Sequence, residues 1–453
     1  MTVIHARTAL LPSGWAQDVA VQVARGRIVS VTTGVAVGVD GVAPVACLIP
    51  APVNLHSHTF QRAMAGLTER RSAGQDSFWT WRTLMYRFLE RLAPEDVEAI
   101  AAMAMVEMAE EGFAAVAEFH YLHHAPGGGT YAHLAEMSGR IGAAAQATGL
   151  GLTLLPVLYE RGGCDGRPLA AGQLRFGNDP ERFLQLVGAV TALAPDLAPD
   201  TVVGIAPHSL RAVSAEGLRA VLEARPAGPV HIHVAEQVAE VGEVLAHTGA
   251  RPVEWLLANA PVDGRWCTIH ATQMQPQETL ALARSGAVAG LCPITEANLG
   301  DGIFDGVRYR AAHGRFGVGT DSNVRISLSE ELRMLEYSQR LGLKGRALMA
   351  EEGQSCGRVL LEAATAGGAQ AAGRAAGRIE AGLWADLLAL DCSGPDMAAS
   401  VGDMALDTWM FARGGVADLW SAGRHIVTGG QHLARDAVRA RYGAAIGRLR
   451  AEL

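Results

Sequence analysis

The chain has 453 residues, of which 49% are apolar and 19% are charged, with a formal net charge of −8. This length predicts two or three domains around a large core. The charged residues are spread along the chain rather than gathered in blocks, so we expect neither a nucleic acid nor a membrane as a partner. No run of eighteen apolar residues and no secretory-type start are found, and we therefore expect a cytoplasmic protein.

The cysteines and lysines restrict the chemistry of the chain. Its six cysteines lie far apart, without CxxC or zinc-ribbon spacing, so we expect buried free thiols rather than disulfides or a structural zinc site. The chain contains one lysine, Lys344, and all its other basic residues apart from histidine are arginines.

The predicted elements fall into three kinds along the chain. Residues 1–48 contain short alternating β-type runs, and the pair Arg25-Gly26 between two of them predicts a hairpin. In residues 49–370, short apolar runs alternate with alanine-rich helical stretches, which is typical of parallel strands joined by helices. Residues 371–430 return to the β style, so we expect both chain ends to form one small flanking β-sandwich. A C-terminal helix is expected in 431–453 from the spacing of Val438, Tyr442, Ile446 and Leu449.

The central segment contains eight candidate strands. They end near Leu55, Phe119, Tyr159, Ala206, His233, Ile269, Cys292 and Gly319. Helices are expected between them, for example over Asp96–Glu111 and Ser329–Leu341. Eight such units predict an α/β fold of the (β/α)8 TIM-barrel class, in which catalytic groups lie at the carboxyl ends of the strands.

Polar residues that can bind a metal or a substrate follow several predicted strands. They are His56, His58, Glu118, His120, Tyr121, His208, Arg211, His231, His233, Glu236, His270 and Asp321. Alternation along a strand places His56 and His58 on one face, where both can contact one ion. His231 and His233 share that geometry, which makes one of them redundant. With Asp321, three imidazoles and one carboxylate suit Zn²⁺ or Fe²⁺ and leave room for a water whose pKa falls towards ~7.

This set of residues resembles the amidohydrolase superfamily, and the resemblance covers nearly the whole chain. It implies that the metal ligands are His56, His58, His233 and Asp321. It also implies that His270 polarises the substrate or positions the water and that Asp321 accepts a proton from that water. Many members hold two metals bridged by a carbamylated lysine on strand four. Because Lys344 follows strand eight, we expect a single divalent ion instead, Zn²⁺ in the first place and Fe²⁺ as the alternative.

Glu236 indicates the reaction class. In the deaminases of this superfamily, an HxxE string such as His233-Val-Ala-Glu236 supplies a carboxyl group that carries protons from water to the departing nitrogen. General acid–base help of this kind contributes about 10²–10⁴ in rate. We therefore favour deamination over amide hydrolysis, with a solvated loop glutamate as the alternative for Glu236.

Seven longer strings are more specific than these ligands. They are "NLHSHTFQRAMAGLTE" (54–69), "DSFWTWRTLMYRF" (76–88), "FHYLHH" (119–124), "APHSLRAV" (206–213), "HVAEQ" (233–237), "CPITEANLGDG" (292–302) and "GTDSN" (319–323). They resemble the N-formimino-L-glutamate deiminases of histidine degradation. The resemblance implies a homodimer in which a metal-bound hydroxide attacks the formimino carbon, giving N-formyl-L-glutamate and ammonia. Asn323 departs from the family pattern, which has histidine there, and leaves the ligands intact.

A dicarboxylate substrate needs fixed cations, and the planar fork of arginine matches a carboxylate. The candidates are Arg82, in a predicted aromatic-flanked turn over 79–82, and Arg211, three residues after His208. Each such contact contributes ~1.5–3 kcal/mol. The resemblance adds three hydrogen-bonding residues to the pocket: Gln61, Tyr121 and His208. With 37 arginines in the chain (38 Lys+Arg less one Lys), a surface role is the default for either one without these strings.

Two other hypotheses remain. One is a deaminase of the same superfamily that acts on guanine or on an adenosine-type thioether, which would need aromatic stacking partners and no pair of arginines placed for carboxylates. The other is a catalytically inactive binding protein on the same scaffold. Such proteins usually lose metal ligands, whereas every ligand position is filled here.

Overall fold

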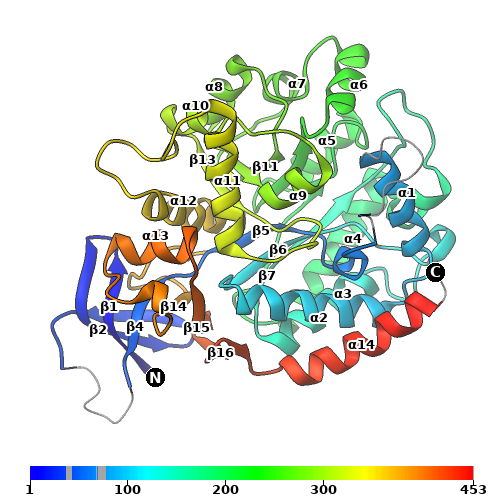
Figure 1. The fold of residues 1–453 in the computed structure, drawn as a ribbon. Helices are drawn as coiled ribbons and strands as arrows, with labels where there is room; N and C mark the ends of the chain where they lie inside the picture. Colours follow the sequence, from blue (N-terminus) through cyan, green and yellow to red (C-terminus); the bar gives the residue numbers. More distant parts are fainter. Residues whose placement is uncertain (37–42, 68, 70–77, 452–453) are drawn as a thin grey trace.

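The computed structural model describes residues 1–36, 43–67, 69 and 78–451. Figure 1 shows a barrel of strands and helices beside a smaller sheet built from the two ends of the chain. The barrel strands are β5 (Val53–Ser57), β6 (Ala115–His120), β7 (Gly151–Leu158), β8 (Val202–Val203) with β9 (Ala206–Pro207), β10 (Val230–Val234), β11 (Trp266–His270), β12 (Val288–Leu291) and β13 (Arg315–Val318). Among the described residues, no helix is long and apolar enough to cross a bilayer.

All pairings within the barrel are parallel. The strands form two runs, β5-β6-β7-β8 and β10-β11-β12-β13, with β9 paired to β7. Parallel bridges between Ser57 and Asp321 and between Ile205 and Val230 join the two runs into a closed ring. Strand four is thus the split pair β8 and β9, and each predicted strand ends within two residues of the observed one. The prediction of a TIM barrel is confirmed.

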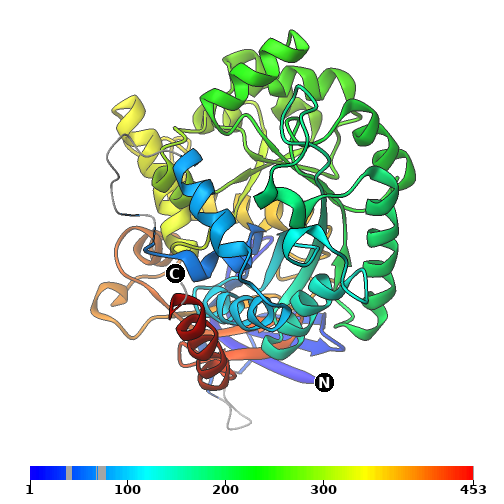
Figure 2. The same ribbon diagram turned by 90° about the vertical axis from the view of Figure 1, so that its right-hand side faces the viewer.

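Helices surround these strands, as Figure 2 shows most clearly for α4 to α8. The barrel helices are α1 (Phe78–Leu89), α2 (Pro94–Glu110), α3 (Glu136–Thr148), α4 (Pro180–Leu193), α5 (Ala215–Ala224), α6 (Val238–Thr248), α7 (Pro252–Asn259), α8 (Pro276–Ser285), α9 (Pro293–Leu299), α10 (Gly306–Ala311), α11 (Leu328–Leu343) and α12 (Cys356–Ala371). Short 3-10 turns are η1 (Thr59–Met64), η2 (Pro126–Gly128), η3 (Ala171–Phe176), η4 (Ala194–Asp196) and η5 (Pro395–Met397). The two helices predicted over Asp96–Glu111 and Ser329–Leu341 are α2 and α11.

The C-terminal helix α14 (Arg435–Ala451) packs along α2. This contact explains why α2 buries residues around most of its circumference, since one side faces the barrel and another faces α14. The buried residues of α14 include Val438, Ile446 and Leu449, which the helical spacing had marked as its apolar face.

The flanking sheet contains eight strands in the order β17-β16-β15-β14-β4-β1-β2-β3. Their bounds are β1 (Thr2–Leu11), β2 (Gly14–Ala24), β3 (Arg27–Thr32), β4 (Val45–Pro50), β14 (Leu387–Asp391), β15 (Gly415–Ser421), β16 (Arg424–Thr428) and β17 (Gln431–His432), with α13 (Asp403–Phe411) between β14 and β15. Arg25 and Gly26 turn the β2–β3 hairpin with φ of 49° and 78°, which suits a two-residue turn. The sheet curls until its edge strand β3 approaches the segment before β14, where Ile28 N donates to Leu383 O at 2.9 Å. It therefore encloses an apolar cluster of its own.

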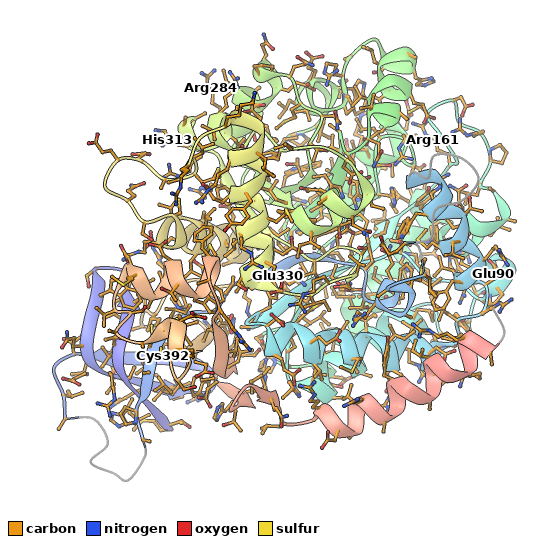
Figure 3. All side chains as sticks on the ribbon, viewed as in Figure 1. Glu90, Arg161, Arg284, His313, Glu330 and Cys392 are labelled. Atoms are coloured by element: carbon orange, nitrogen blue, oxygen red, sulfur yellow. The ribbon has the colours of Figure 1, made fainter. Side chains whose placement is uncertain are left out.

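A buried ionic cluster joins this sheet to the barrel. Arg374 Nε donates to Asp386 Oδ2 at 2.6 Å, and Arg374 Nη2 lies 2.8 Å from Asp200 Oδ2, just before β8. Arg424 of β16 contacts the other oxygen of Asp200 at 2.7 Å. All six cysteines are free, as predicted, and only Cys392, labelled on the flanking sheet in Figure 3, is not fully buried.

Candidate active site

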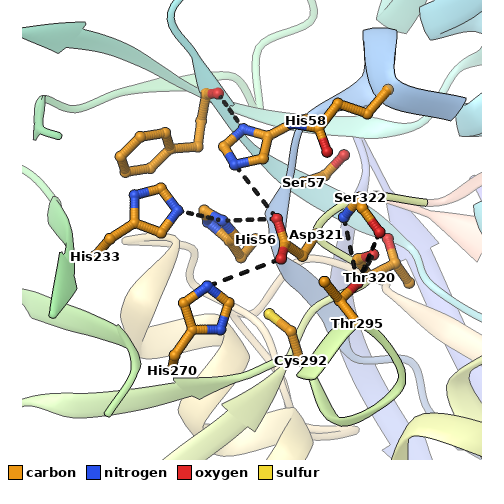
Figure 4. A network of polar contacts seen from close by, with 12 residues as sticks. His56, Ser57, His58, His233, His270, Cys292, Thr295, Thr320, Asp321 and Ser322 are labelled. Carbon is orange, nitrogen blue, oxygen red and sulfur yellow. Dashed lines mark hydrogen bonds and ion pairs between the residues drawn. The ribbon is translucent and has the colours of Figure 1, made fainter. Parts of the chain in front are cut away.

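Four residues predicted as metal ligands converge at the carboxyl end of the barrel, as Figure 4 shows. The Nε2 atoms of His56 and His233 lie 3.1 Å apart. Asp321 Oδ1 lies 3.5 Å from His56 Nε2 and 3.3 Å from His58 Nε2. His56 belongs to β5, His58 follows it, His233 belongs to β10 and Asp321 follows β13, so three distant parts of the chain meet here.

The histidines of this cluster have the form that a metal requires. Burial lowers the pKa of His56, His58 and His233, so each imidazole is neutral. Nδ1 of His58 donates to Phe119 O at 2.9 Å, and Nδ1 of His233 donates to His208 O at 3.2 Å, which leaves the two Nε2 lone pairs directed at one point. Tetrahedral ligands of a cation at about 2.1 Å stand about 3.4 Å apart. The spacing and chemistry of these donors therefore fit a divalent cation.

Backbone pairing between the first and last barrel strands holds Asp321 against the histidines. Asp321 N donates to His56 O at 3.0 Å, and His58 N donates to Asp321 O at 2.9 Å. Asn323 Nδ2 donates to Ser57 Oγ and to His58 O, each at 3.1 Å. Asn323 has a φ of 55°, a left-handed conformation that asparagine tolerates. The residue that departs from the family pattern thus binds the two strands together.

His270 and Glu236 lie beside this cluster. His270 Nε2 is 3.7 Å from Glu236 Oε1 and 3.8 Å from Asp321 Oδ2. On its other side, His270 Nδ1 contacts Glu296 Oε1 at 3.2 Å. Burial raises the pKa of Glu236 although the nearby His270 opposes the shift. Burial alone would lower the pKa of His270, but the carboxylates of Glu236 and Glu296 outweigh it and raise that pKa. The Glu236 carboxyl and the His270 imidazole therefore lie side by side next to the candidate metal ligands.

One cavity opens above these residues. It is lined by His58, Gln61, Trp81, Arg82, Met85, Tyr86, Tyr121, Tyr159, Phe176, His208, Arg211, His233, Glu236, His270, Leu299, Asp321 and Ser322. The structure thus brings every predicted substrate-binding and catalytic residue to one cavity. Of the residues predicted as metal ligands, catalytic groups or substrate contacts, only His56 is not among those that line it.

The predicted substrate residues come from separate elements of the cavity wall. Gln61, in η1, donates through Nε2 to the hydroxyl of Tyr121 at 2.7 Å. Arg82 lies in α1, with its guanidinium carbon 5.4 Å from the centre of the Tyr86 ring. The prediction of a turn over 79–82 was wrong, because this segment is helical; the Trp79 side chain lies outside the described residues. Arg211 is buried in the segment after β9, near His208.

Comparisons with known proteins follow this geometry. The model of the amidohydrolase family matches residues 47–424, and that of the formimidoylglutamate deiminase N-terminal domain matches residues 1–41. The chain belongs to the amidohydrolase family. A formimidoylglutamate deiminase of Pseudomonas aeruginosa is 48% identical over 96% of this chain and 97% of its own. This amidohydrolase is therefore an enzyme that hydrolyses a carbon–nitrogen bond.

Two solved structures resemble this amidohydrolase over its length. An amidohydrolase from Brucella melitensis is 48% identical, with a TM-score of 0.95 over 99% of this chain and 100% of its own. An adenosine deaminase from Xanthomonas campestris with bound zinc is 22% identical, with a TM-score of 0.81 over 99% of this chain and 98% of its own, which shows the shared fold.

The structure also shows where His231 and Lys344 lie. His231 lies deeper in the barrel of this amidohydrolase than His233 and donates to Ala371 O at the end of α12 at 2.8 Å, so His233 is the one at the cluster. Lys344 caps the C-terminal end of α11, outside the cavity lining.

Sequence reasoning missed part of the cavity wall. The missed lining residues are Trp81, Met85, Tyr86, Tyr159, Phe176, Leu299 and Ser322. It also missed Glu296, which accepts from Cys292 N at 2.8 Å and contacts His270. Glu296 stands inside the quoted string 292–302, but only the fold of α9 turns its carboxylate towards β11.

Proposed function

We propose that this protein hydrolyses N-formimino-L-glutamate to N-formyl-L-glutamate and ammonia, a step of histidine degradation. We call the four converging residues His56, His58, His233 and Asp321 the His–Asp cluster. The observation that carries the proposal is a single cavity that joins this cluster to two arginines, Arg82 and Arg211. The substrate has two carboxylates and one amidine, so it needs cations at one end and a hydrolytic group at the other. The 48% identity to the deiminase of Pseudomonas aeruginosa supports this reaction.

The wall of the cavity would bind the glutamate part of the substrate. Arg82 and Arg211 supply planar forks for its carboxylates, and each charge-assisted contact contributes about 1.5–3 kcal/mol. Gln61, Tyr121 and His208 add uncharged hydrogen-bonding groups to the wall of the same cavity. These five side chains would hold the formimino carbon near Asp321 and Glu236.

The four converging ligands would hold one divalent cation, Zn²⁺ in the first place and Fe²⁺ as the alternative. Bound there, such a cation supplies a nucleophile at neutral pH because it lowers the pKa of water. Zinc is present in two solved relatives of the same fold, the adenosine deaminase from Xanthomonas campestris and the atrazine chlorohydrolase TrzN from Arthrobacter aurescens.

The acidic residues would move the protons. The water oxygen adds to the formimino carbon, the C–N bond to the imino nitrogen breaks, and both water protons leave on that nitrogen as ammonia. Asp321 accepts a proton from the attacking water, and Glu236 delivers protons to the departing nitrogen. The raised pKa of Glu236 suits a group that takes up and releases protons near neutral pH. His270 polarises the amidine through Nε2, while its other ring nitrogen, Nδ1, contacts Glu296.

A purine deaminase is the second candidate, because aromatic residues also line the cavity. Trp81, Tyr86 and Tyr159 could stack on a ring. A 5-methylthioadenosine/S-adenosylhomocysteine deaminase of Natronomonas pharaonis is 27% identical over 86% of this chain and 82% of its own. Ammonia release should be measured with N-formimino-L-glutamate, guanine and 5-methylthioadenosine. We expect turnover of the first alone; turnover of a purine without the first would overturn the proposal.

We further infer that the enzyme acts in the cytoplasm as a homodimer on a small dicarboxylate, without a nucleic acid or membrane partner. Sedimentation of the metal-loaded protein at micromolar concentration tests the dimer, which a mass of one chain would contradict.

A further inference from the structure

Arg175 is a fully buried arginine that lies next to the proposed substrate cavity without lining it. It belongs to η3, and its side chain is 0% exposed. The residue after it, Phe176, does line the cavity. Four oxygen atoms accept from its guanidinium: His124 O at 2.8 Å, Leu92 O at 3.0 Å, the Tyr131 hydroxyl at 3.2 Å, and Leu89 O. All four acceptors are uncharged.

These acceptors include the C-terminal end of α1. Leu89 is the last residue of α1, and Leu92 lies in the turn between α1 and α2. The last carbonyl groups of a helix have no partner within the helix and carry a partial negative charge. A buried guanidinium needs several hydrogen bonds to offset its removal from water. The cation and the helix end therefore stabilise each other.

The segments that Arg175 joins form one wall of the cavity. Helix α1 carries Trp81, Arg82, Met85 and Tyr86, and the loop after β6 begins at Tyr121. The main chain strengthens the junction, because Arg175 O accepts from His123 N and His124 N, each at 3.0 Å. Figure 1 shows α1 at one side of the molecule, outside the ring of strands. Its position is thus set by such contacts rather than by strand pairing.

A second contact brings η3 close to α1. A Cβ atom at Gly172 would lie 2.5 Å from Cγ of Tyr86, so that ring packs directly on the backbone of η3. The Phe176 ring lies 6.1 Å from the Tyr86 ring and 4.8 Å from the Tyr121 ring, centre to centre. Both ends of the η3–α1 contact are therefore tightly packed.

We propose that Arg175 is a positioning residue for substrate binding. By fastening α1 to η3 and to the loop after β6, it sets the distance between Arg82 and the His–Asp cluster. That distance must match the spacing between the carboxylate and the reacting carbon of a substrate, so it determines which substrates the cavity accepts. This inference rests on the proposed function, because it assigns Arg82 to a substrate carboxylate.

The test compares Arg175→Met with Arg175→Lys, which keeps the charge but has fewer donors. Because small displacements of binding groups have large effects, we expect Arg175→Met to raise KM for N-formimino-L-glutamate about tenfold or more. The kcat of Arg175→Met should stay within about threefold of the wild-type value, and its metal content should be unchanged. The KM of Arg175→Lys should lie between those of the wild type and Arg175→Met. On an Arg82→Met background the further rise in KM should nearly vanish, because the positioned contact is already lost. A full additional rise there would overturn the proposal.

Gly172→Ala tests the same contact without removing the buried cation, and it decides the matter if Arg175→Met does not fold. The added Cβ should displace Tyr86 and α1 and raise KM; an unchanged KM in folded Gly172→Ala would contradict the proposal. Hydrogen exchange gives a measurement independent of turnover. Amides of residues 82–89 should exchange faster in the variants than in the wild type, while β5–β7 stay protected. If the wild type has no activity on this substrate, the proposed function fails. The structural part of the inference, that Arg175 holds α1, is rejected if the amides of residues 82–89 exchange equally fast in the variants and the wild type.

Discussion

The Nε2 atom of His270 lies 3.7 Å from the Oε1 atom of Glu236 at the floor of the cavity. The side chains of both are buried, and burial raises the pKa of Glu236 while His270 works against that shift. A carboxyl group in this setting can bind and release a proton near neutral pH. The pair thus places a proton carrier beside the point on which the four candidate metal ligands converge.

Glu236→Gln should lower kcat by about two to four orders of magnitude, because glutamine cannot transfer the proton. The metal content should stay at the wild-type level, since Glu236 is not among the four ligands. Steady-state kinetics with metal analysis measures both, and Glu223→Gln on the exposed face of α5 serves as control. Near-normal turnover in Glu236→Gln would remove this residue from the mechanism.

Changing Arg82 or Arg211 to Met should mainly weaken substrate binding. Each change removes a charge-assisted contact of about 1.5–3 kcal/mol, which corresponds to a rise in KM of roughly 10- to 150-fold. The exposed Arg219→Met is the matched control and should leave KM unchanged. If neither cavity variant raises KM, the two arginines do not bind the carboxylates.

Removal of the metal should abolish activity and lower the unfolding temperature. A ligand that binds only the folded chain stabilises it. Dialysis against a chelator, followed by calorimetry and readdition of Zn²⁺ or Fe²⁺, measures the effect. We expect one ion per chain, and no loss of metal or activity in Lys344→Arg. Two ions per chain, or a metal-free Lys344→Arg, would contradict the single-ion site.

The stability contribution of Asp200 should depend on pH. Burial alone would raise its pKa, but hydrogen bonds from Arg424 and the charge of Arg374 lower the pKa from an ordinary value of 3.8 to about 2. Because the folded value is the lower one, the contribution is complete above about pH 4 and is lost as the pH falls through 2. Asp200→Asn should therefore lower the unfolding free energy by about 2 kcal/mol at pH 6 and by progressively less below pH 4.

Urea unfolding of the wild type, Asp200→Asn and the exposed control Asp196→Asn at pH 6, 4 and 3 tests this expectation. A difference between wild type and Asp200→Asn that stays constant from pH 6 to pH 3 would show that the carboxylate charge does not stabilise the junction between barrel and sheet.

Much of the fold follows from local patterns. The apolar runs that end near Phe119, His233 and Ile269 are strands β6, β10 and β11, because apolar β-type runs between helical stretches suit the buried strands of a parallel sheet. The Arg25-Gly26 turn was likewise predictable, since its backbone conformation depends on those two residues. The segment over 79–82, which belongs to α1, was not, because its aromatic residues fit a turn or a helix equally well.

The sequence by itself determined the residue types of the candidate site and their places at strand ends, because the period of a strand and the topology of a parallel barrel are local and general properties. Only the tertiary structure decided that Glu296 contacts His270 and that Arg175 holds α1. Each of these contacts joins segments distant in the chain. Their geometry depends on how loops and helices pack on the barrel, which no spacing within a single segment encodes.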